Sequence, residues 1–317
     1  MVKTPKQKKF ALIGAAGYIA PRHMRAIKDT GNLLVAALDP FDSVGIIDSY
    51  FPNADFFIEP ERFDRHLDKL RRSGTDKIDY VSICSPNFLH DAHIRLALRN
   101  DAHAICEKPL LLNPWNLKGL EDIESETGKR IYNILQLRHH PSIIALKEKY
   151  DAQSEDKVHD IELTYITSRG KWYFYSWKGD IKKSGGVVTN IGIHFFDMLS
   201  WIFGKVESST VHIAEDNKAA GMLHLQKANV KWYLSLDKND LPRKAREMDL
   251  STYRSITVDN SEVEFSGGFT DLHTVSYQEI LGGRGYGIPD AANSIEIAHM
   301  IRNQRAVGKR GEYHPFL

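Results

Sequence analysis

Short apolar runs alternate with stretches of helical periodicity over the first 138 residues. Each run is apolar at successive positions, as a strand buried on both faces requires, and the residues between runs become apolar at every third or fourth position. This alternation predicts a parallel sheet covered by helices on both faces, an α/β domain. The predicted strands cover residues 10–13, 33–38, 79–84, 104–106 and 131–135, and one clear helix runs over residues 114–127.

The pattern changes beyond residue 138. Pro141 opens a helix, and the polar loop 151–156 separates it from segments in which apolar and polar residues alternate, such as 161–165 and 230–236. Alternation of period two is typical of antiparallel strands with one face open to solvent or to a partner. We therefore predict an N-terminal α/β domain at 1–138 and, at 139–317, an α+β domain with a large, mostly antiparallel open sheet. The open face favours self-association.

Composition narrows the function classes. Hydrophobic residues make up 42% and charged residues 26% of the 317 positions, and the net charge is +1. A neutral globular chain of this kind has no field that attracts nucleic acid or an anionic membrane, so neither is expected as a partner. Two cysteines in apolar runs, no metal-ligand spacing and no signal-like segment predict a cytoplasmic protein without disulfides or a metal site. No apolar run approaches the ~18 residues of a membrane span.

A glycine-containing turn joins the first predicted strand to the first helix. It reads Gly14-x-x-Gly17-x-x-Ala20, one residue longer between the glycines than the usual dinucleotide-binding turn, so a plain tight turn stays an alternative. Asp39 ends the second strand, 22 positions after Gly17, where a carboxylate can hold the ribose hydroxyls and repel a 2′-phosphate. A turn-forming role for Asp39 before Pro40 is the other reading. Together the two features predict a Rossmann fold that binds NAD rather than NADP.

Two polar segments directly follow strands of the same predicted sheet, Ser85-Pro86-Asn87 and Glu107-Lys108-Pro109. Ligands of such sheets bind outside the carboxyl ends of the strands, so we expect Lys108 beside the nicotinamide. Oxidation of an alcohol needs a base for the hydroxyl proton, and a lysine can serve when desolvation or a nearby cation lowers its pKa. The alternative is a structural lysine at a strand end.

These segments resemble the glucose–fructose oxidoreductase/inositol dehydrogenase superfamily. The likeness covers nearly the whole chain and rests on GAAGYIA (14–20), SPNFLH (85–90), EKP (107–109) and GGVVTNIGIHFFD (185–197). A narrower likeness, to the bacterial UDP-N-acetyl-2-amino-2-deoxyglucuronate 3-dehydrogenases of O-antigen synthesis, rests on QLRHHPSIIALK (136–147), RGKWYFYSWKGD (169–180), FSGGFTDLHT (265–274) and SYQEILGGRGYGI (276–288).

The resemblance implies the roles of single residues. His194 is one of 14 histidines, and its place in G-x-H-x-x-D, ending at Asp197, is what singles it out as a catalytic or substrate-orienting group. Many members have Asp four residues earlier, whereas this chain has Asn190, which cannot act as a base. The implied catalytic residues are Lys108, His194 and Asn190. The implied cofactor-binding residues are Gly14, Gly17, Tyr18, Ile19, Asp39, Ser85, Pro86, Asn87, His90, Glu107, Lys108, Gln136, Arg169 and Trp172. The implied substrate-binding residues are Lys108, Tyr173, Asn190, His194, Arg284 and Tyr286.

The activity that the resemblance implies is NAD-dependent oxidation of the 3-hydroxyl of UDP-N-acetylglucosaminuronic acid in lipopolysaccharide synthesis. Some relatives recycle bound NADH with 2-oxoglutarate, and tetramers are common. A neutral chain must meet such an anionic substrate with local cations. Candidates are the cluster Arg138, His139 and His140, and the cluster Arg169, Lys171 and Lys178. Another sugar or polyol dehydrogenase, or a non-catalytic NAD-binding protein, remains open at this point.

Overall fold

The structure is a computed structural model that describes residues 7–74, 76–153, 157–263 and 271–317. Residues 1–6, the second half of the predicted loop 151–156 and part of the FSGGFTDLHT string therefore lie outside the described residues. The chain forms two compact units. The first contains residues 1–111, 115–136 and 270–291, and the second contains residues 112–114, 137–269 and 292–317.

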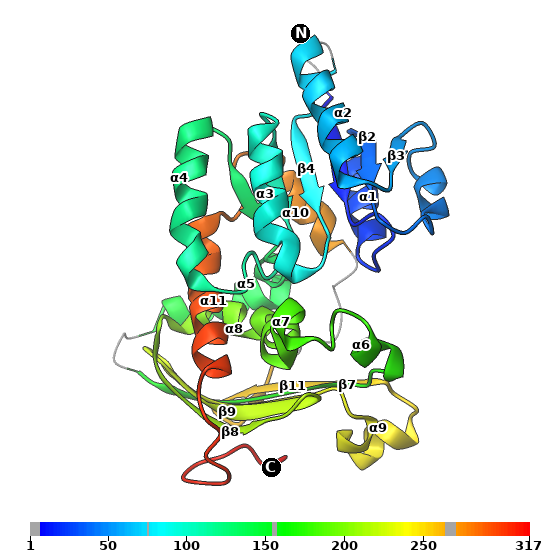
Figure 1. Ribbon diagram of the computed structural model, residues 1–317. Coiled ribbons are helices and arrows are strands. Elements are labelled where there is room, and N and C mark those ends of the chain that lie inside the picture. The colour runs from blue at the N-terminus through cyan, green and yellow to red at the C-terminus, as the bar shows by residue number, and fades with distance from the viewer. Residues whose placement is uncertain (1–6, 75, 154–156, 264–270) are drawn as a thin grey trace. The chain divides into compact units, whose positions relative to one another are not determined.

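The first unit is built on a six-stranded sheet in the order β3-β2-β1-β4-β5-β6, and all of its pairs are parallel. Strands β2, β3 and β4 of this sheet are labelled in Figure 1. The predicted α/β domain is confirmed, because the apolar runs form its central strands. The strands are β1 (Lys9–Ile13), β2 (Leu33–Leu38), β3 (Asp55–Phe57), β4 (Tyr80–Ile83), β5 (His103–Cys106) and β6 (Ile131–Asn133). The helices between them are α1 (Ala20–Asp29), α2 (Pro60–Ser73), α3 (His90–Arg99) and α4 (Leu117–Thr127).

Strand order in this sheet reverses at β1, whose neighbours are β2 and β4. Ligands of doubly wound sheets bind at this kind of switch point, outside the carboxyl ends of the strands. Cys84 and Cys106, at the ends of β4 and β5, are free thiols, and burial raises the pKa of both well above its usual value. They are packing residues rather than reactive ones.

The second unit contains a six-stranded sheet in the order β12-β11-β7-β10-β9-β8. The predicted, mostly antiparallel sheet is confirmed, with one exception: the central strands β7 and β10 pair in parallel over eight residues. The strands are β7 (His159–Thr167), β8 (Val206–Ala214), β9 (Lys218–Leu225), β10 (Ala228–Ser235), β11 (Thr252–Val258) and β12 (Ser261–Glu262). Its helices are α5 (Pro141–Asp151), α6 (Lys171–Tyr175), α7 (Ile181–Ser184), α8 (Ile193–Phe203), α9 (Arg243–Glu247) and part of α11 (Ile288–Arg302).

Helix α8 packs on one face of this second sheet. Phe196 meets the fully buried Trp232 of β10 edge-to-face, with ring centroids 5.5 Å apart. Gly192, just before α8, allows the close approach, because a Cβ there would lie 2.8 Å from Leu234. The helical stretch Ile181–Phe203 is apolar and long enough to cross a membrane, but 78% of its most apolar window is buried, as in a core helix.

The compact units differ from a single division at residue 138, most of all in the segment that follows the second sheet. Helix α10 (Leu272–Leu281) follows the second sheet in sequence but belongs to the first unit, where it packs on α1. The reason is Tyr277, which is fully buried and stacks on Phe10 of β1 with ring centroids 5.8 Å apart. The chain thus crosses between the units more than once.

Candidate active site

The glycine turn between β1 and α1 is shaped for a close backbone approach. Gly14 has φ +89°, and a Cβ there would lie 2.6 Å from the carbonyl carbon of Cys84, so only glycine fits. The backbone N–H groups of Tyr18 and Ile19, at the start of α1, make no hydrogen bond to another described residue. Such amides at a helix N-terminus bind anions, so the turn fits a dinucleotide pyrophosphate.

Asp39 has the turn-forming role that its position suggested, and its role in holding a ribose stays a prediction. Its Oδ2 accepts a hydrogen bond from the N–H of Ala16 at 2.9 Å, and its Oδ1 accepts one from Phe41 at 2.9 Å. The carboxylate therefore braces the turn after β2 and also lies against the glycine turn, where an adenosine ribose would be held.

We expect the replacement of Asp39 by Ser, combined with Pro40→Arg, to shift cofactor preference toward NADP. The substitutions remove the negative charge that repels a 2′-phosphate and add a positive one. Titrations of the parent and the variant with both cofactors measure the shift. Since Asp39 also braces the turn, Asp39→Asn is the control for lost hydrogen bonds. Tighter binding of NADP by the parent protein would contradict the assignment.

The segments after β4 and β5 are tied together by His90. This side chain is fully buried, its Nδ1 lies 2.7 Å from the carbonyl oxygen of Pro109, and its Nε2 lies 2.9 Å from that of Ser85. Ser85 in turn bonds His93 through its hydroxyl at 2.8 Å. His90 was predicted to bind cofactor; both of its ring nitrogens lie against backbone carbonyl oxygens of the protein, and a role in cofactor binding stays a prediction.

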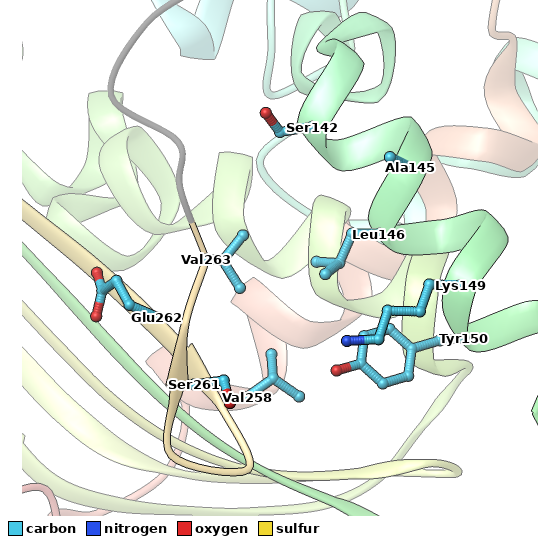
Figure 2. A pocket seen from close by; sticks show the side chains of 9 residues that line it. All are labelled: Ser142, Ala145, Leu146, Lys149, Tyr150, Val258, Ser261, Glu262 and Val263. Carbon is cyan, nitrogen blue, oxygen red and sulfur yellow. The ribbon is translucent and has the colours of Figure 1, made fainter.

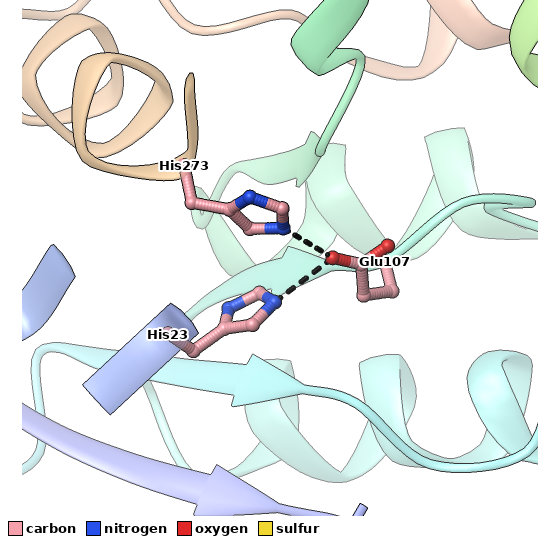
Figure 3. A group of neighbouring side chains, drawn as sticks. All are labelled: His23, Glu107 and His273. Atoms are coloured by element: carbon pink, nitrogen blue, oxygen red, sulfur yellow. Dashed lines mark hydrogen bonds and ion pairs between the residues drawn. The ribbon is translucent and has the colours of Figure 1, made fainter. Parts of the chain in front are cut away.

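Glu107 is also directed into the first unit. Its Oε1 accepts hydrogen bonds from His23 Nε2 at 3.0 Å and His273 Nε2 at 2.9 Å (Figure 3). One potential metal-ligand atom from each of these three buried residues lies within 4.8 Å of the other two, a spacing that a metal site would also have. In this structure the same atoms are joined by the two hydrogen bonds. The carboxylate that was predicted to bind cofactor is therefore engaged inside the unit. Lys108, which follows it, is half-buried at the carboxyl end of β5.

Two residues near the end of β6, Asn133 and Gln136, are also relevant to the candidate site. Asn133 donates from Nδ2 to the carbonyl oxygens of Cys106 at 2.9 Å and Glu107 at 3.2 Å, so it supports the backbone that carries Lys108. Gln136 has a buried Oε1 with no hydrogen-bond partner in the described part of the chain. A buried acceptor without a partner is a good position for a ligand donor, in agreement with the predicted role of Gln136.

In the second unit, Tyr173 and Asn190, two of the predicted substrate-binding residues, contact each other, and their role in substrate binding stays a prediction. Asn190 Nδ2 contacts the Tyr173 hydroxyl at 2.7 Å, and both side chains are buried. Asn190 lies in the π-helical turn Val188–Gly192, which runs directly into α8. His194 follows four residues later on α8 and is half-buried. Irregular turns of this kind are frequent at functional sites.

The interpretation of Arg138 as part of an anion-binding cluster needs correction. Its guanidinium is buried and forms a two-point ion pair with Asp197 of α8, with Nε–Oδ2 at 3.0 Å and Nη2–Oδ1 at 2.7 Å. The pair fixes α8 one turn beyond His194. Sequence spacing could not show this, because the partners are 59 residues apart.

Asn87, another predicted cofactor residue, is buried, whereas several others keep exposed surface. Arg169 and Trp172 are exposed at the start of α6, and Lys178 lies 5.9 Å from the Trp172 ring and 4.4 Å from the Trp177 ring. Burial and the charge of Arg169 lower the pKa of Lys178. Arg284, in the first unit, donates from Nε to Glu279 Oε2 at 2.7 Å. The backbone carbonyl oxygen of Tyr286 accepts a hydrogen bond from the backbone N–H of Asn133. The role of Arg284 in substrate binding stays a prediction.

A pocket of about 360 Å³ lies in the second unit between α5 and the β11–β12 hairpin (Figure 2). None of the predicted site residues lines it. Its lining residues are Ser142, Ala145, Leu146, Lys149, Tyr150, Val258, Ser261, Glu262 and Val263.

Comparison with known proteins agrees with the fold and with the cofactor. Residues 8–134 match the family described as "Oxidoreductase family, NAD-binding Rossmann fold", and residues 156–241 match "Oxidoreductase family, C-terminal alpha/beta domain". The glucose-6-phosphate 3-dehydrogenase of Bacillus subtilis (strain 168) is 25% identical over 202 residues, which cover 62% of this chain and 54% of that protein. The chain thus spans about half the length of the curated relatives that it matches.

Solved structures match over the whole chain. The WlbA (WbpB) dehydrogenase of Thermus thermophilus, in complex with NAD and α-ketoglutarate, is 50% identical with a TM-score of 0.95, and the match covers 98% of this chain and 100% of that one. The same dehydrogenase in complex with NAD and UDP-GlcNAcA is 49% identical with a TM-score of 0.94 and equal coverage. With both family domains present in order, this chain belongs to the Gfo/Idh/MocA family of NAD-binding oxidoreductases.

Proposed function

We propose that the protein oxidises the 3-hydroxyl of UDP-N-acetylglucosaminuronic acid (UDP-GlcNAcA) to the 3-keto sugar. The observation that carries the proposal is the 49% identity, across the full length of that chain, to a dehydrogenase crystallised with NAD and UDP-GlcNAcA. The chain supplies the groups that this reaction needs: a glycine turn with open amides, Asp39 beside it, and Lys108 at the end of β5.

The chemistry follows from the residue types. NAD, when bound, accepts the hydride that leaves the sugar carbon. Lys108 takes the hydroxyl proton, and His194 is the second group that can hold or return it. Asn190 cannot take a proton, so its amide, held against the Tyr173 hydroxyl at 2.7 Å, orients a sugar hydroxyl.

We further propose that 2-oxoglutarate reoxidises the bound cofactor. The keto carbon would receive the hydride and its oxygen a proton from Lys108 or His194, so that 2-hydroxyglutarate leaves and NAD is regenerated. The proposal is supported by the Thermus thermophilus dehydrogenase in complex with NAD and α-ketoglutarate. The predicted cation cluster Arg169, Lys171 and Lys178 would hold the carboxylate of either substrate.

The 3-keto group is a natural substrate for an aminotransferase, so we place the reaction in the synthesis of an amino sugar for lipopolysaccharide O-antigen. A cytoplasmic location follows from the nucleotide-sugar substrate. We also propose that the protein assembles as a homotetramer through the open face of the second sheet.

We expect purified protein to carry NADH and to turn over UDP-GlcNAcA only weakly with added NAD, because the bound cofactor leaves slowly. Addition of 2-oxoglutarate should restore turnover. The measurement is incubation with UDP-GlcNAcA, NAD and 2-oxoglutarate, followed by chromatography of the nucleotide sugars and organic acids.

Three results would contradict this proposal in different ways. Oxidation of UDP-N-acetylglucosamine instead would mean that the sugar carboxylate is not recognised. Oxidation of inositol or a free sugar would favour another dehydrogenase of the family. Bound NAD with no oxidation of any of these compounds would favour a non-catalytic NAD-binding protein.

A further inference from the structure

A charged side chain lies inside the first unit directly before Lys108. The Glu107 side chain is 7% exposed, and burial of a charge is unfavourable unless the charge is paired or hydrogen-bonded. Its Oε1 accepts hydrogen bonds from His23 and His273, and its Oε2 accepts the backbone N–H of Lys108 at 3.3 Å. One carboxylate oxygen is therefore held by two helices and the other by the turn that carries Lys108.

The hydrogen bonds continue beyond His23 in a single direction. A carboxylate only accepts, so His23 donates from Nε2, and a neutral ring then accepts at Nδ1. The Tyr277 hydroxyl lies 2.8 Å from that Nδ1 and 2.6 Å from Ser82 Oγ, so Tyr277 donates to His23 and Ser82 donates to Tyr277. Burial lowers the pKa of His23, which favours the neutral ring.

The charge state of Glu107 agrees with this direction. Burial alone would raise the pKa of its carboxyl, but the hydrogen bonds from His23 and His273 hold that pKa well below its usual range. Glu107 is therefore an ionised acceptor for both histidines. The network joins α1, α10, β4 and the end of β5, although His273 is 166 residues from Glu107 in sequence.

The other side of the turn is held as well. Pro109 contacts the buried His90 through its carbonyl oxygen at 2.7 Å, and the Glu107 carbonyl accepts a hydrogen bond from Asn133 at 3.2 Å. Glu107 and Pro109 are buried, and Lys108 between them keeps exposed surface. The backbone of Lys108 is thus fixed at both ends, while its side chain is the part of the turn that can meet a ligand.

We propose that Glu107, His23 and His273 are positioning residues that hold Lys108 where it can take the substrate proton. The inference rests on the proposed function, in which Lys108 is the base. Proton transfer depends steeply on geometry, and a misplacement of ~1 Å can reduce a rate about 10²-fold. A buried network that ends on the backbone N–H of Lys108 restricts the movement of this backbone before substrate binds.

The test compares two buried histidines that each contact a carboxylate. His273→Leu removes one donor to Glu107. His159→Leu removes the matching contact in the second unit, where His159 is 2% exposed and lies 2.8 Å from Asp259. We expect both variants to lose stability. His273→Leu alone should lower kcat about 10- to 100-fold while NAD affinity and the KM for UDP-GlcNAcA change by no more than about twofold.

Two further variants separate positioning from folding. His273→Gln keeps an N–H donor and should recover part of kcat, and Tyr277→Phe keeps the buried ring while removing the donor to His23. In a Lys108→Ala background, His273→Leu should reduce the residual rate much less than in the parent, because a positioning residue acts only through the group that it places. If His273→Leu does not fold, the kcat of Tyr277→Phe is compared with that of His159→Leu instead.

The outcomes distinguish this inference from the proposed function. Parent turnover that Lys108→Met abolishes supports the function, and a full kcat in His273→Leu then overturns the positioning role alone. Equal losses of kcat in His273→Leu and His159→Leu, or an undiminished effect in the Lys108→Ala background, would also overturn it. The positioning role would also be overturned if the parent bound one metal ion per chain and His273→Leu bound none, because the cluster would then be a metal site. A parent without turnover would overturn both.

Discussion

Replacement of Lys108 by Met should abolish sugar oxidation while NAD still binds. The Lys108 side chain is half-buried at the carboxyl end of β5, whereas its neighbours Glu107 and Pro109 are buried. Loss of a general base typically reduces the rate about 10²- to 10⁴-fold. Steady-state turnover of UDP-GlcNAcA and the dissociation constant of NAD are the two quantities to measure.

His194→Ala is the companion variant in the second unit. It removes the second proton-handling group without touching the glycine turn, so we expect turnover to be lost and NAD affinity to be kept. Lys118→Met, on an exposed face of α4, is a matched lysine control and should behave as the parent does. Full activity in Lys108→Met would refute the proposed mechanism, whatever the result for His194.

The second large effect is on stability. Arg138→Met should lower the free energy of unfolding by about 3 to 5 kcal/mol, because it leaves the Asp197 carboxylate buried without its partner. Both side chains of this pair are at most 5% exposed, and the contact joins the segment before α5 to α8. Denaturant unfolding of the parent and the variant measures the difference.

Two controls make the comparison specific to burial. Arg243→Met removes an exposed arginine that pairs with Glu247 at 2.7 Å, and it should change stability by less than about 1 kcal/mol. The double variant Arg138→Met with Asp197→Leu replaces the buried pair by apolar groups and should recover much of the loss. Equal effects of Arg138→Met and Arg243→Met would show that the buried pair contributes nothing special.

Local sequence patterns predicted most of the first unit. The apolar run 33–38 became β2 with the same bounds, and the predicted helix 114–127 became a short 3-10 turn at Pro114–Asn116 followed by α4, because strand and helix periodicity depend on neighbours within a few residues. Gly14 was recognisable for the same reason, since a strand-to-helix turn that approaches a ligand needs a residue without a Cβ.

Partners far apart in the sequence were not predictable in this way. The sequence placed Arg138 in a cluster of cations for an anionic substrate, and the structure pairs it with Asp197. His23 and His273 were not singled out at all. The signals available for them were a histidine in the first helix after the glycine turn and the LHT at the end of the FSGGFTDLHT string. The parallel pairing of β7 with β10 was also missed, because alternation reports burial of a face and not the direction of the neighbour.

The sequence by itself determined that this chain forms a Rossmann unit and an open-sheet unit, that it carries an NAD-type turn ending at Asp39, and that Lys108 follows a strand of the first sheet. These features are encoded within windows of a few to about 20 residues, where periodicity and turn chemistry act. Only the tertiary structure decided that α10 returns to the first unit and that Glu107 faces inward to His23 and His273. Burial makes an unpaired carboxylate unfavourable, so its partners are selected by packing in space, and their positions in the sequence carry no spacing rule that could reveal them.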